Sequence, residues 1–245
     1  MQSSTRCTIQ RAPPSVSPSA SRMAIANIST IGKTGQRKLS SATVGIAGLG
    51  GVGGITFHLL VRAGIGTLRI SDSGFFEESN ANRQALWTKG TDGRKKTDVA
   101  GEAAKSINPK CRILQFPDIT AGSSYTFASG CSSVIDATDR PHSRLAVWKG
   151  CKKAATPYIF SSALGSKGML TIFDGKDMLR EFGMKGKRYN NFLTCDHSLG
   201  PVSNLIGCLA AQMAINIILK KPAIKFPSIV SIDAFSSEPV RIHRF

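Results

Sequence analysis

Apolar residues recur along this chain in short runs that alternate with longer amphipathic segments. The runs typical of β-strands lie at residues 42–48, 66–73, 111–116 and 132–139. Apolar positions recur at helical spacing in residues 54–64, 93–109 and 142–155. The first of these helical segments ends on Gly64, a residue typical of helix C-caps. Strands that alternate with helices predict a parallel, doubly wound α/β sheet.

The second half of the chain predicts strands that pair differently. Runs at residues 157–165 and 168–175 are joined by a glycine-containing turn, and residues 228–233 and 239–245 form a closing pair. Such hairpin-like pairs predict antiparallel strands at one edge of an otherwise mostly parallel sheet. The segment 176–191 is basic and short of apolar residues, so we expect a surface excursion there.

A strongly apolar helix is predicted at residues 202–221, and Pro222 ends it. Gly, Gln and Asn interrupt the apolar run, so we expect the helix to fall short of a bilayer-spanning one and expect no membrane partner. The sequence leaves open whether this helix is buried in the core or lies at a subunit interface.

The length of 245 residues suits a single domain, which we place at residues 24–245. Residues 1–23 are rich in Ser, Pro and Arg and contain no acid, a composition that cannot bury a core. This leader resembles an organelle transit peptide, and the alternative is a disordered leader without a targeting role. The two alternatives place the protein in a mitochondrion or plastid, or in the cytoplasm.

A glycine-rich stretch at residues 45–54, "GIAGLGGVGG", joins the first strand to the first helix of this pattern. Small residues there let the backbone approach a phosphate, which then lies against the free N–H groups of the helix N-terminus. The candidate nucleotide-binding glycines are Gly48, Gly50, Gly51 and Gly53. Asp72, at the end of the next strand, is positioned to accept a hydrogen bond from a ribose hydroxyl. These features fit a nicotinamide cofactor and ATP equally well.

Charged residues further along the chain separate these two ligands. The loop after Asp72 contains "SNANRQ" with Arg83, Lys96 opens the following helix, and Asp139 is expected to end the fourth strand. All of them fall at the carboxyl ends of strands or in adjoining loops, where open α/β sheets bind ligands. Cations stabilise phosphate charge and a carboxylate can hold magnesium, so the set favours a triphosphate over a dinucleotide.

The chain is strongly basic, with 32 Lys and Arg against 15 Asp and Glu and a formal net charge of +17. This excess favours anionic partners, namely nucleotides, nucleic acid or an acidic protein, and the alternative is a solvated basic surface. The sequence contains no basic motif interleaved with aromatic residues of the kind that reads RNA.

Cysteine usage argues against a structural metal. The six cysteines are Cys7, Cys111, Cys131, Cys151, Cys195 and Cys208. They form no Cys-x-x-Cys pair and no secreted disulfide framework, so we expect no structural zinc and a reducing compartment. Cys111, Cys131, Cys151 and Cys208 fall in strand or helix patterns and are expected to be small core residues. Cys195 lies near His197, which can favour a thiolate, and the alternative is an ordinary loop cysteine.

Taken together, the glycine stretch, Asp72, "SNANRQ", Lys96, "DATD" and a late "LGPVSNLIG" helix resemble the ubiquitin-like-protein-activating superfamily, which includes ThiF, MoeB and HesA. The resemblance covers most of residues 28–245. It implies a Rossmann-like α/β fold that binds ATP and magnesium and adenylates the C-terminal glycine of a small ubiquitin-like or sulfur-carrier protein. It also implies a homodimer.

The resemblance assigns roles to residues by position. The four glycines would line the nucleotide and Asp72 its ribose. Asn80, Arg83, Gln84 and Lys96 would surround the phosphates, and Asp139 would serve the magnesium ion. Arg83, Lys96 and Asp139 would then be the catalytic group. Cys195 lies near the place of the cysteine in thiol-using relatives, about two residues closer to the "GP" that opens the late helix.

The chain departs from the superfamily pattern at several positions. Gly74 stands where an Asp usually follows Asp72, and Arg140 stands where an Asn usually follows Asp139. An N-terminal Arg that reaches a partner subunit's ATP is matched by Ala24, with Arg22 two residues away.

Three other functions therefore stay open. One is a tRNA threonylcarbamoyladenosine dehydratase-type enzyme, which "INPKCRI" and the basic charge favour, whereas "LGPVSNLIG" and "SSALGSKGML" favour the carrier-protein branch. Another is a catalytically inactive nucleotide-binding scaffold subunit. A nicotinamide-dependent oxidoreductase has only the glycine stretch and Asp72 in its favour.

Overall fold

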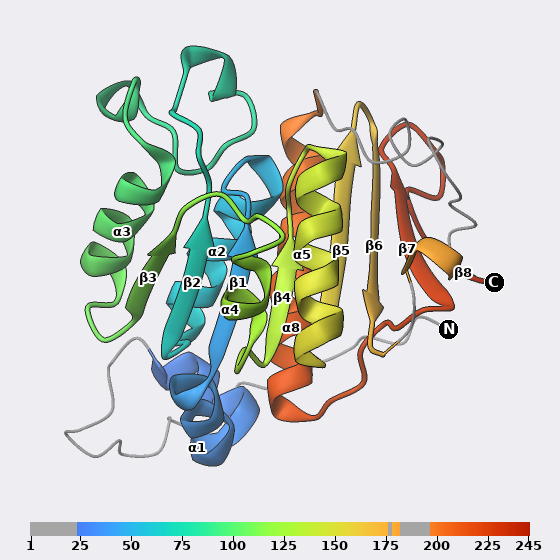
Figure 1. The fold of residues 1–245 in the computed structure, drawn as a ribbon, viewed down its shortest axis with the longest axis horizontal. Helices are drawn as coiled ribbons and strands as arrows, with labels where there is room; N and C mark the ends of the chain where they lie inside the picture. The colour runs from blue at the N-terminus through green and yellow to red at the C-terminus, as the bar shows by residue number, and fades with distance from the viewer. Residues whose placement is uncertain (1–23, 176–177, 182–196) are drawn as a thin grey trace, which may run out of the picture.

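The computed structural model describes residues 24–175, 178–181 and 197–245. Its centre is one eight-stranded sheet in the order β3-β2-β1-β4-β5-β6-β7-β8 (Figure 1). The strands are β1 Thr43–Ala47, β2 Thr67–Ser71, β3 Arg112–Phe116, β4 Ser133–Asp136, β5 Tyr158–Leu164, β6 Lys167–Phe173, β7 Ser228–Asp233 and β8 Val240–Arg244. Strands β1 to β5 pair in parallel, and β6, β7 and β8 add antiparallel strands at one edge. The predicted fold class is confirmed.

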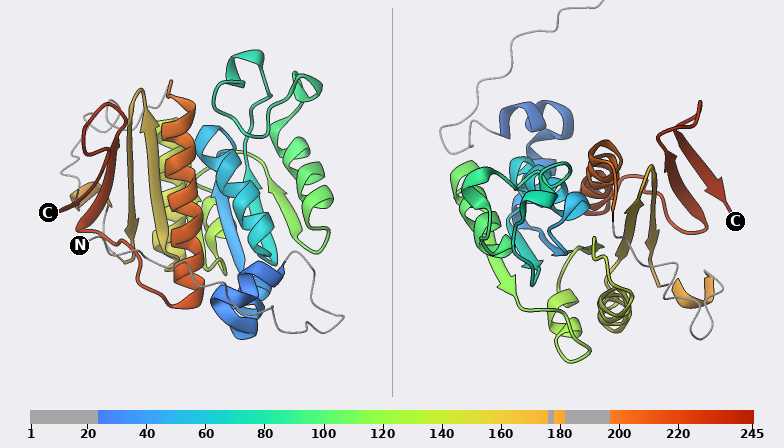
Figure 2. Two further views of the ribbon diagram at one scale, coloured as in Figure 1. Left: turned by 180° about the vertical axis from the view of Figure 1, so that it is seen from behind. Right: turned by 90° about the horizontal axis from the view of Figure 1, so that it is seen from above.

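Helices cover both faces of this sheet (Figure 2). They are α1 Ile25–Ser41, α2 Gly51–Ala63, α3 Lys96–Ile107, α4 Ser124–Ala128, α5 Pro141–Ala154, α6 Met178–Glu181 and α8 Gly200–Leu219, with short 3-10 turns at Glu78–Asn80 and Lys89–Thr91. Side chains of α2, α3 and α8 form one buried cluster with the sheet, including Phe57 and Ile206. A second cluster on the other face includes Phe127 and Trp148 from α4 and α5. The molecule therefore has the three layers of a doubly wound fold.

Helix α8 is the apolar helix predicted near the end of the chain. An 18-residue window of this 20-residue helix has a mean hydropathy of 1.8, so by length and composition alone it could cross a bilayer, contrary to our expectation; core helices of soluble proteins pass the same test. In this fold it packs on α2: a Cβ on Gly207 would meet the Val52 carbonyl and the Ile55 side chain, and Thr56 Oγ1 donates to the Gly207 carbonyl at 3.0 Å. Its N-terminal half lies in the core. Cys208, on its outer face, is exposed, so the prediction of a core position for it was wrong.

Several element boundaries differ from the sequence prediction. Helix α2 begins at Gly51 rather than residue 54, so the last glycines of the stretch lie inside its first turn. Its C-cap is Gly64 in the left-handed conformation (φ 81°), as predicted. Strand β4 ends at Asp136, so Asp139 lies in the following loop and does not end the strand. The core positions predicted for the remaining three cysteines are confirmed, because Cys111, Cys131 and Cys151 are all buried.

Helix α1 was not predicted at all. Gly32 interrupts it with φ 72°, and only Gly35 and Leu39 are buried, so few of its residues belong to the core. Most of the predicted surface excursion at 176–191 lies outside the described residues; residues 178–181 of it form α6.

Candidate active site

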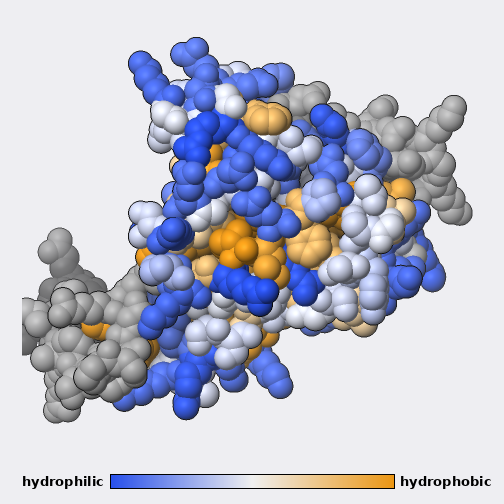
Figure 3. Space-filling view, turned by 60° about the vertical axis from the view of Figure 1, so that its left-hand side comes forward, coloured by the Kyte–Doolittle hydropathy of each residue, from blue (hydrophilic) through white to orange (hydrophobic). Residues whose placement is uncertain are grey.

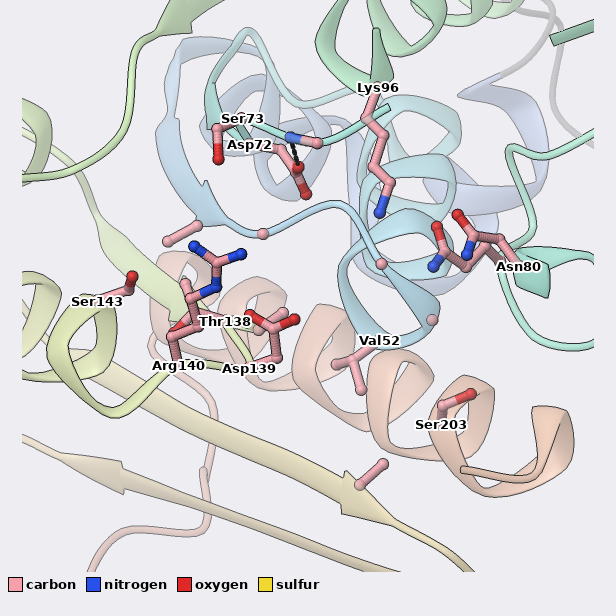
Figure 4. A pocket seen from close by; sticks show the side chains of 18 of the residues that line it. Val52, Asp72, Ser73, Asn80, Lys96, Thr138, Asp139, Arg140, Ser143 and Ser203 are labelled. Atoms are coloured by element: carbon pink, nitrogen blue, oxygen red, sulfur yellow. Dashed lines mark hydrogen bonds between the residues drawn. The ribbon is translucent and has the colours of Figure 1, made fainter. Parts of the chain in front are cut away.

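A cavity of about 380 Å³ opens where the carboxyl ends of β1, β2 and β4 meet (Figure 4). Nine of the predicted site residues line it: Gly48, Gly50, Gly51, Asp72, Asn80, Arg83, Gln84, Lys96 and Asp139. Parallel strands present their carboxyl ends at one edge of the sheet, which brings these distant residues together. Gly53 is not among the lining residues. Cys195 and Arg22 lie outside the described residues, so a role for either stays a prediction.

The glycine turn between β1 and α2 is packed against two neighbouring backbones. Gly48 has φ +88° and donates its N–H to the Ser71 carbonyl at 2.8 Å. A Cβ on Gly48 would overlap the Ala137 carbonyl oxygen, and a Cβ on Gly53 would overlap the Gly48 carbonyl oxygen. Gly53 therefore supports the turn from behind instead of facing the cavity. Gly50 and Gly51 lie at the α2 N-terminus, whose first N–H groups lack intrahelical partners.

We expect Gly53→Ala to disrupt this turn and Gly54→Ala, one residue along, to leave it intact. The new methyl group at position 53 would force the Gly48 carbonyl to move, at a cost of about 1–3 kcal/mol. At position 54 the nearest atom, the Leu49 carbonyl oxygen, is 3.4 Å away, and Ala is a better helix former than Gly. Urea unfolding and ATP titration of both variants test this. Equal stability and equal ATP affinity of the two variants would show that the turn does not depend on Gly53.

Asp72 links the end of β2 to the glycine turn. Its Oδ2 accepts from the Leu49 N–H at 2.6 Å and its Oδ1 from the Gly74 N–H at 2.7 Å. A Cβ on Gly74 would lie 3.5 Å from Lys96 Nζ, so a side chain there would touch this amine. Gly74 offers no acidic side chain at this place, and the Lys96 amine has no ion pair within the described residues. The amine projects into the cavity (Figure 4).

The "SNANRQ" loop forms the wall beside α2. Arg83 Nη1 donates to the Ser79 carbonyl at 2.9 Å and to Asn82 Oδ1 at 2.8 Å, which holds its guanidinium at the cavity. Asn80 is buried, and its side chain accepts from the Glu77 N–H at 3.3 Å. Gln84 is only 6% exposed, and its Oε1 is a buried acceptor with no hydrogen-bond partner among the described residues. An unpaired buried acceptor on a cavity wall is a place where a bound donor group gains a full hydrogen bond.

A buried polar cluster, which sequence reasoning missed, supports the opposite wall. Asp136 is fully buried and accepts from the Thr138 N–H at 2.9 Å and from its hydroxyl at 2.7 Å. Arg144 Nη1 lies 3.5 Å from Asp136 Oδ2, and the Tyr158 hydroxyl donates to the same oxygen. Burial, with the nearby Asp136, raises the pKa of Tyr158. The cluster fixes the loop that carries Asp139. The first aspartate of "DATD" was the available signal, but its partners lie on α5 and β5.

The side chains of Asp139 and Arg140 project from this loop into the cavity, from below in the view of Figure 4. Both are exposed, and neither forms an ion pair with another described residue. The Arg140 guanidinium points toward Asp72 and Ser73 (Figure 4). Arg140, the departure from the superfamily pattern, thus adds a third cation to Arg83 and Lys96. Ala24, the other departure, is buried beside α1 and is not among the cavity-lining residues.

Comparison with known proteins agrees with this geometry. The chain matches the ThiF family over residues 22–245. It is 32% identical over 195 residues to the adenylyltransferase and sulfurtransferase UBA4 of Eremothecium gossypii, an alignment that covers 77% of this chain and 44% of UBA4. It is 30% identical over 214 residues to the molybdopterin-synthase adenylyltransferase of Salmonella typhimurium, covering 83% of this chain and 84% of that protein.

Solved structures show the same fold. A crystal structure of Escherichia coli MccB with ATP superposes with a TM-score of 0.75 at 21% identity, covering 92% of this chain and 71% of MccB. The chain spans less than half the length of UBA4, so only part of that protein is represented. The family match extends over all the described residues and includes every wall of the cavity. The chain belongs to the ThiF family.

Proposed function

We propose that this protein is an ATP-dependent adenylyltransferase that activates the C-terminal carboxylate of a small ubiquitin-like or sulfur-carrier protein. One observation carries the proposal: the cavity in front of the glycine turn is lined by three cations and one exposed carboxylate, namely Arg83, Lys96, Arg140 and Asp139. A hydride-transferring enzyme does not need three cations and a carboxylate at this place, whereas a cleaved triphosphate does. The names of the relatives, an adenylyltransferase and an adenylyltransferase with sulfurtransferase activity, support the same chemistry.

In the proposed reaction a carboxylate oxygen of the carrier attacks the α-phosphorus of ATP. The new oxygen–phosphorus bond forms as the bond to the bridging oxygen breaks, and pyrophosphate leaves with the electron pair. The products are a carrier acyl-adenylate and pyrophosphate. No general base is needed, because a C-terminal carboxylate is already ionised at neutral pH.

Residues of this chain would serve the phosphates and the ribose. The backbone N–H groups of Gly50 and Gly51 lie at the N-terminus of α2 and would face the phosphates. The positive end of the helix dipole at this terminus favours bound negative charge. Arg83 and Lys96 would stabilise the charge that develops on the α-phosphate. Asp72 already accepts two backbone N–H groups, so a ribose hydroxyl would use its remaining lone pairs.

Magnesium fits this site only as an ion that the triphosphate brings. Within the described residues no group of three or more His, Cys, Asp or Glu side chains could hold a metal. Mg²⁺ keeps several waters and takes one or two carboxylates together with substrate phosphates, and Asp139 can supply that single carboxylate. When bound, the ion would neutralise charge on the leaving phosphates. The superfamily resemblance also implies a homodimer, which sedimentation velocity of the full chain would test.

ATP–pyrophosphate exchange tests the function directly. We expect label from pyrophosphate to enter ATP when a small protein ending in Gly-Gly is added, and not when its last two residues are removed. Exchange that requires tRNA instead would assign the chain to the tRNA-modifying branch. Tight ATP binding without exchange on any substrate would make it a scaffold subunit, and either result would overturn the proposal.

A further inference from the structure

One end of the sheet carries many exposed cations on segments that contain no acidic residue. We call the end away from the cavity the basal face, formed by residues 33–43, 60–68, 104–113, 128–133, 150–158 and 216–228. These segments contain no Asp or Glu. They contain twelve cations: Lys33, Arg37, Lys38, Arg62, Lys105, Lys110, Arg112, Lys152, Lys153, Lys220, Lys221 and Lys225. At the cavity end the two signs are mixed: the loops there contain the acids Asp72, Glu77, Glu78, Asp92, Asp118 and Asp139 together with the cations Arg83, Lys89, Arg94, Lys95, Lys96 and Arg140.

The basal segments lie side by side because β1 to β5 are parallel, so the connections into them share one edge. Hydrogen bonds join neighbouring connections directly: Thr67 N–H donates to the Ala42 carbonyl at 3.0 Å, and Arg112 N–H to the Gly66 carbonyl at 2.9 Å. Figure 1 shows α1 and the lower ends of α3, α5 and α8 along this edge. The twelve basal cations therefore lie on one surface of the molecule.

All twelve of these side chains are exposed. One acid lies at this end of the sheet beside the six segments: Asp174 follows Phe173, which pairs with Tyr158, and forms an ion pair with Lys225 at 2.5 Å. The following have no ion pair with any described residue: Arg62, Lys105, Lys110, Arg112, Lys220 and Lys221. A cation in the last turn of a helix interacts favourably with the helix dipole. This interaction explains the positions of Lys38, Arg62 and Lys105 in the last turns of α1, α2 and α3. The dipole does not account for Lys110 or Arg112, which follow the end of α3, nor for the lack of acids within the six segments.

We propose that the basal face binds nucleic acid through its phosphate backbone. A field of one sign attracts a polyanion, and each neutralised phosphate releases counterions. An anionic membrane is the less favoured partner, because surface-bound proteins insert large apolar side chains, and none of the exposed large apolar residues lies in the basal segments. Beside the face, Tyr125 is 43% exposed and Lys153 Nζ lies 5.2 Å from its ring centroid, a pairing on which an unstacked base can lie.

A matched pair of variants tests the proposal. The basal variant carries Lys110→Gln, Arg112→Gln, Lys220→Gln and Lys221→Gln. The control carries Lys89→Gln, Lys95→Gln, Lys167→Gln and Arg241→Gln, which remove the same four charges from exposed positions elsewhere on the molecule. Binding of a fluorescein-labelled RNA hairpin to the full chain is followed by anisotropy at several salt concentrations. We expect the basal variant to bind at least about 10-fold more weakly and its log K against log salt slope to shrink by roughly 3, while the control stays near wild type.

Equal weakening of RNA binding in both variants would mean that net charge alone attracts RNA. This result would overturn the proposal that the basal face is a specific binding surface. Binding of phosphatidylserine vesicles with no binding of RNA would assign the face to a membrane instead. None of the eight substituted residues lines the cavity, so both variants should match the wild type in ATP–pyrophosphate exchange and in Tm. The RNA measurement does not depend on whether the protein adenylates a carrier.

Discussion

Replacing Arg83 or Lys96 with alanine is expected to lower ATP–pyrophosphate exchange by about 100-fold or more in each case, because a preorganised charge aimed at the reacting phosphate acts mainly on the transition state. Arg83 is held at the cavity by the Ser79 carbonyl and Asn82 Oδ1, and Lys96 has no ion pair with a described residue to neutralise it. The measurement is the initial exchange rate at saturating ATP and carrier.

Lys95→Ala is the matched control for Lys96→Ala. It removes the same charge one residue earlier in the chain, where the side chain is exposed and is not among those lining the cavity. We expect it to keep near wild-type exchange. Rates that survive both Arg83→Ala and Lys96→Ala would refute the assigned mechanism, whereas a loss in all three variants would point to a general electrostatic effect.

Asp136→Ala is expected to cost about 3–5 kcal/mol in the free energy of unfolding, because it removes the buried carboxylate that balances the charge of the buried Arg144 guanidinium. Arg144 is only 1% exposed and Asp136 is fully buried, so water cannot replace the lost carboxyl group. Thr138 also loses the acceptor of its N–H and hydroxyl, which frees the loop that presents Asp139. Urea unfolding of the variant measures the cost.

Asp174→Ala provides the comparison. Asp174 pairs with Lys225 at 2.5 Å, but both side chains are about half exposed, so the pair is screened by solvent and we expect a loss of at most about 1 kcal/mol. If Asp136→Ala were no more destabilising than Asp174→Ala, the buried cluster would not be what fixes the loop.

Local sequence was sufficient for features that depend on neighbouring residues. The alternation of strands and helices, the C-cap at Gly64, the start of α3 at Lys96 and the antiparallel edge all follow from periodicity and turn residues close in the chain. The cavity could also be anticipated, because parallel strands bring their carboxyl ends to one edge of the sheet. Nine of the predicted residues accordingly line it.

Other features depend on contacts that no local pattern records. Asp136 supports the cavity wall only because α5 and β5 place Arg144 and Tyr158 against it. Gly53 must be glycine because the chain turns back at Gly48, five residues earlier, and so it supports the turn without lining the cavity. Helix α1 was missed because it is mostly polar, and its few buried positions, Gly35 and Leu39, are defined by packing.

The sequence by itself therefore determined the fold class, the glycine turn and the cations around the cavity, because each depends on residue types at short spacing. Only the tertiary structure decided which side chains of the strongly apolar α8 face the core, how the buried Asp136 cluster holds the loop of Asp139, and that twelve exposed cations lie together on the basal face. Those properties arise when segments far apart in the chain come into contact, and their physical cause is the parallel sheet that aligns them.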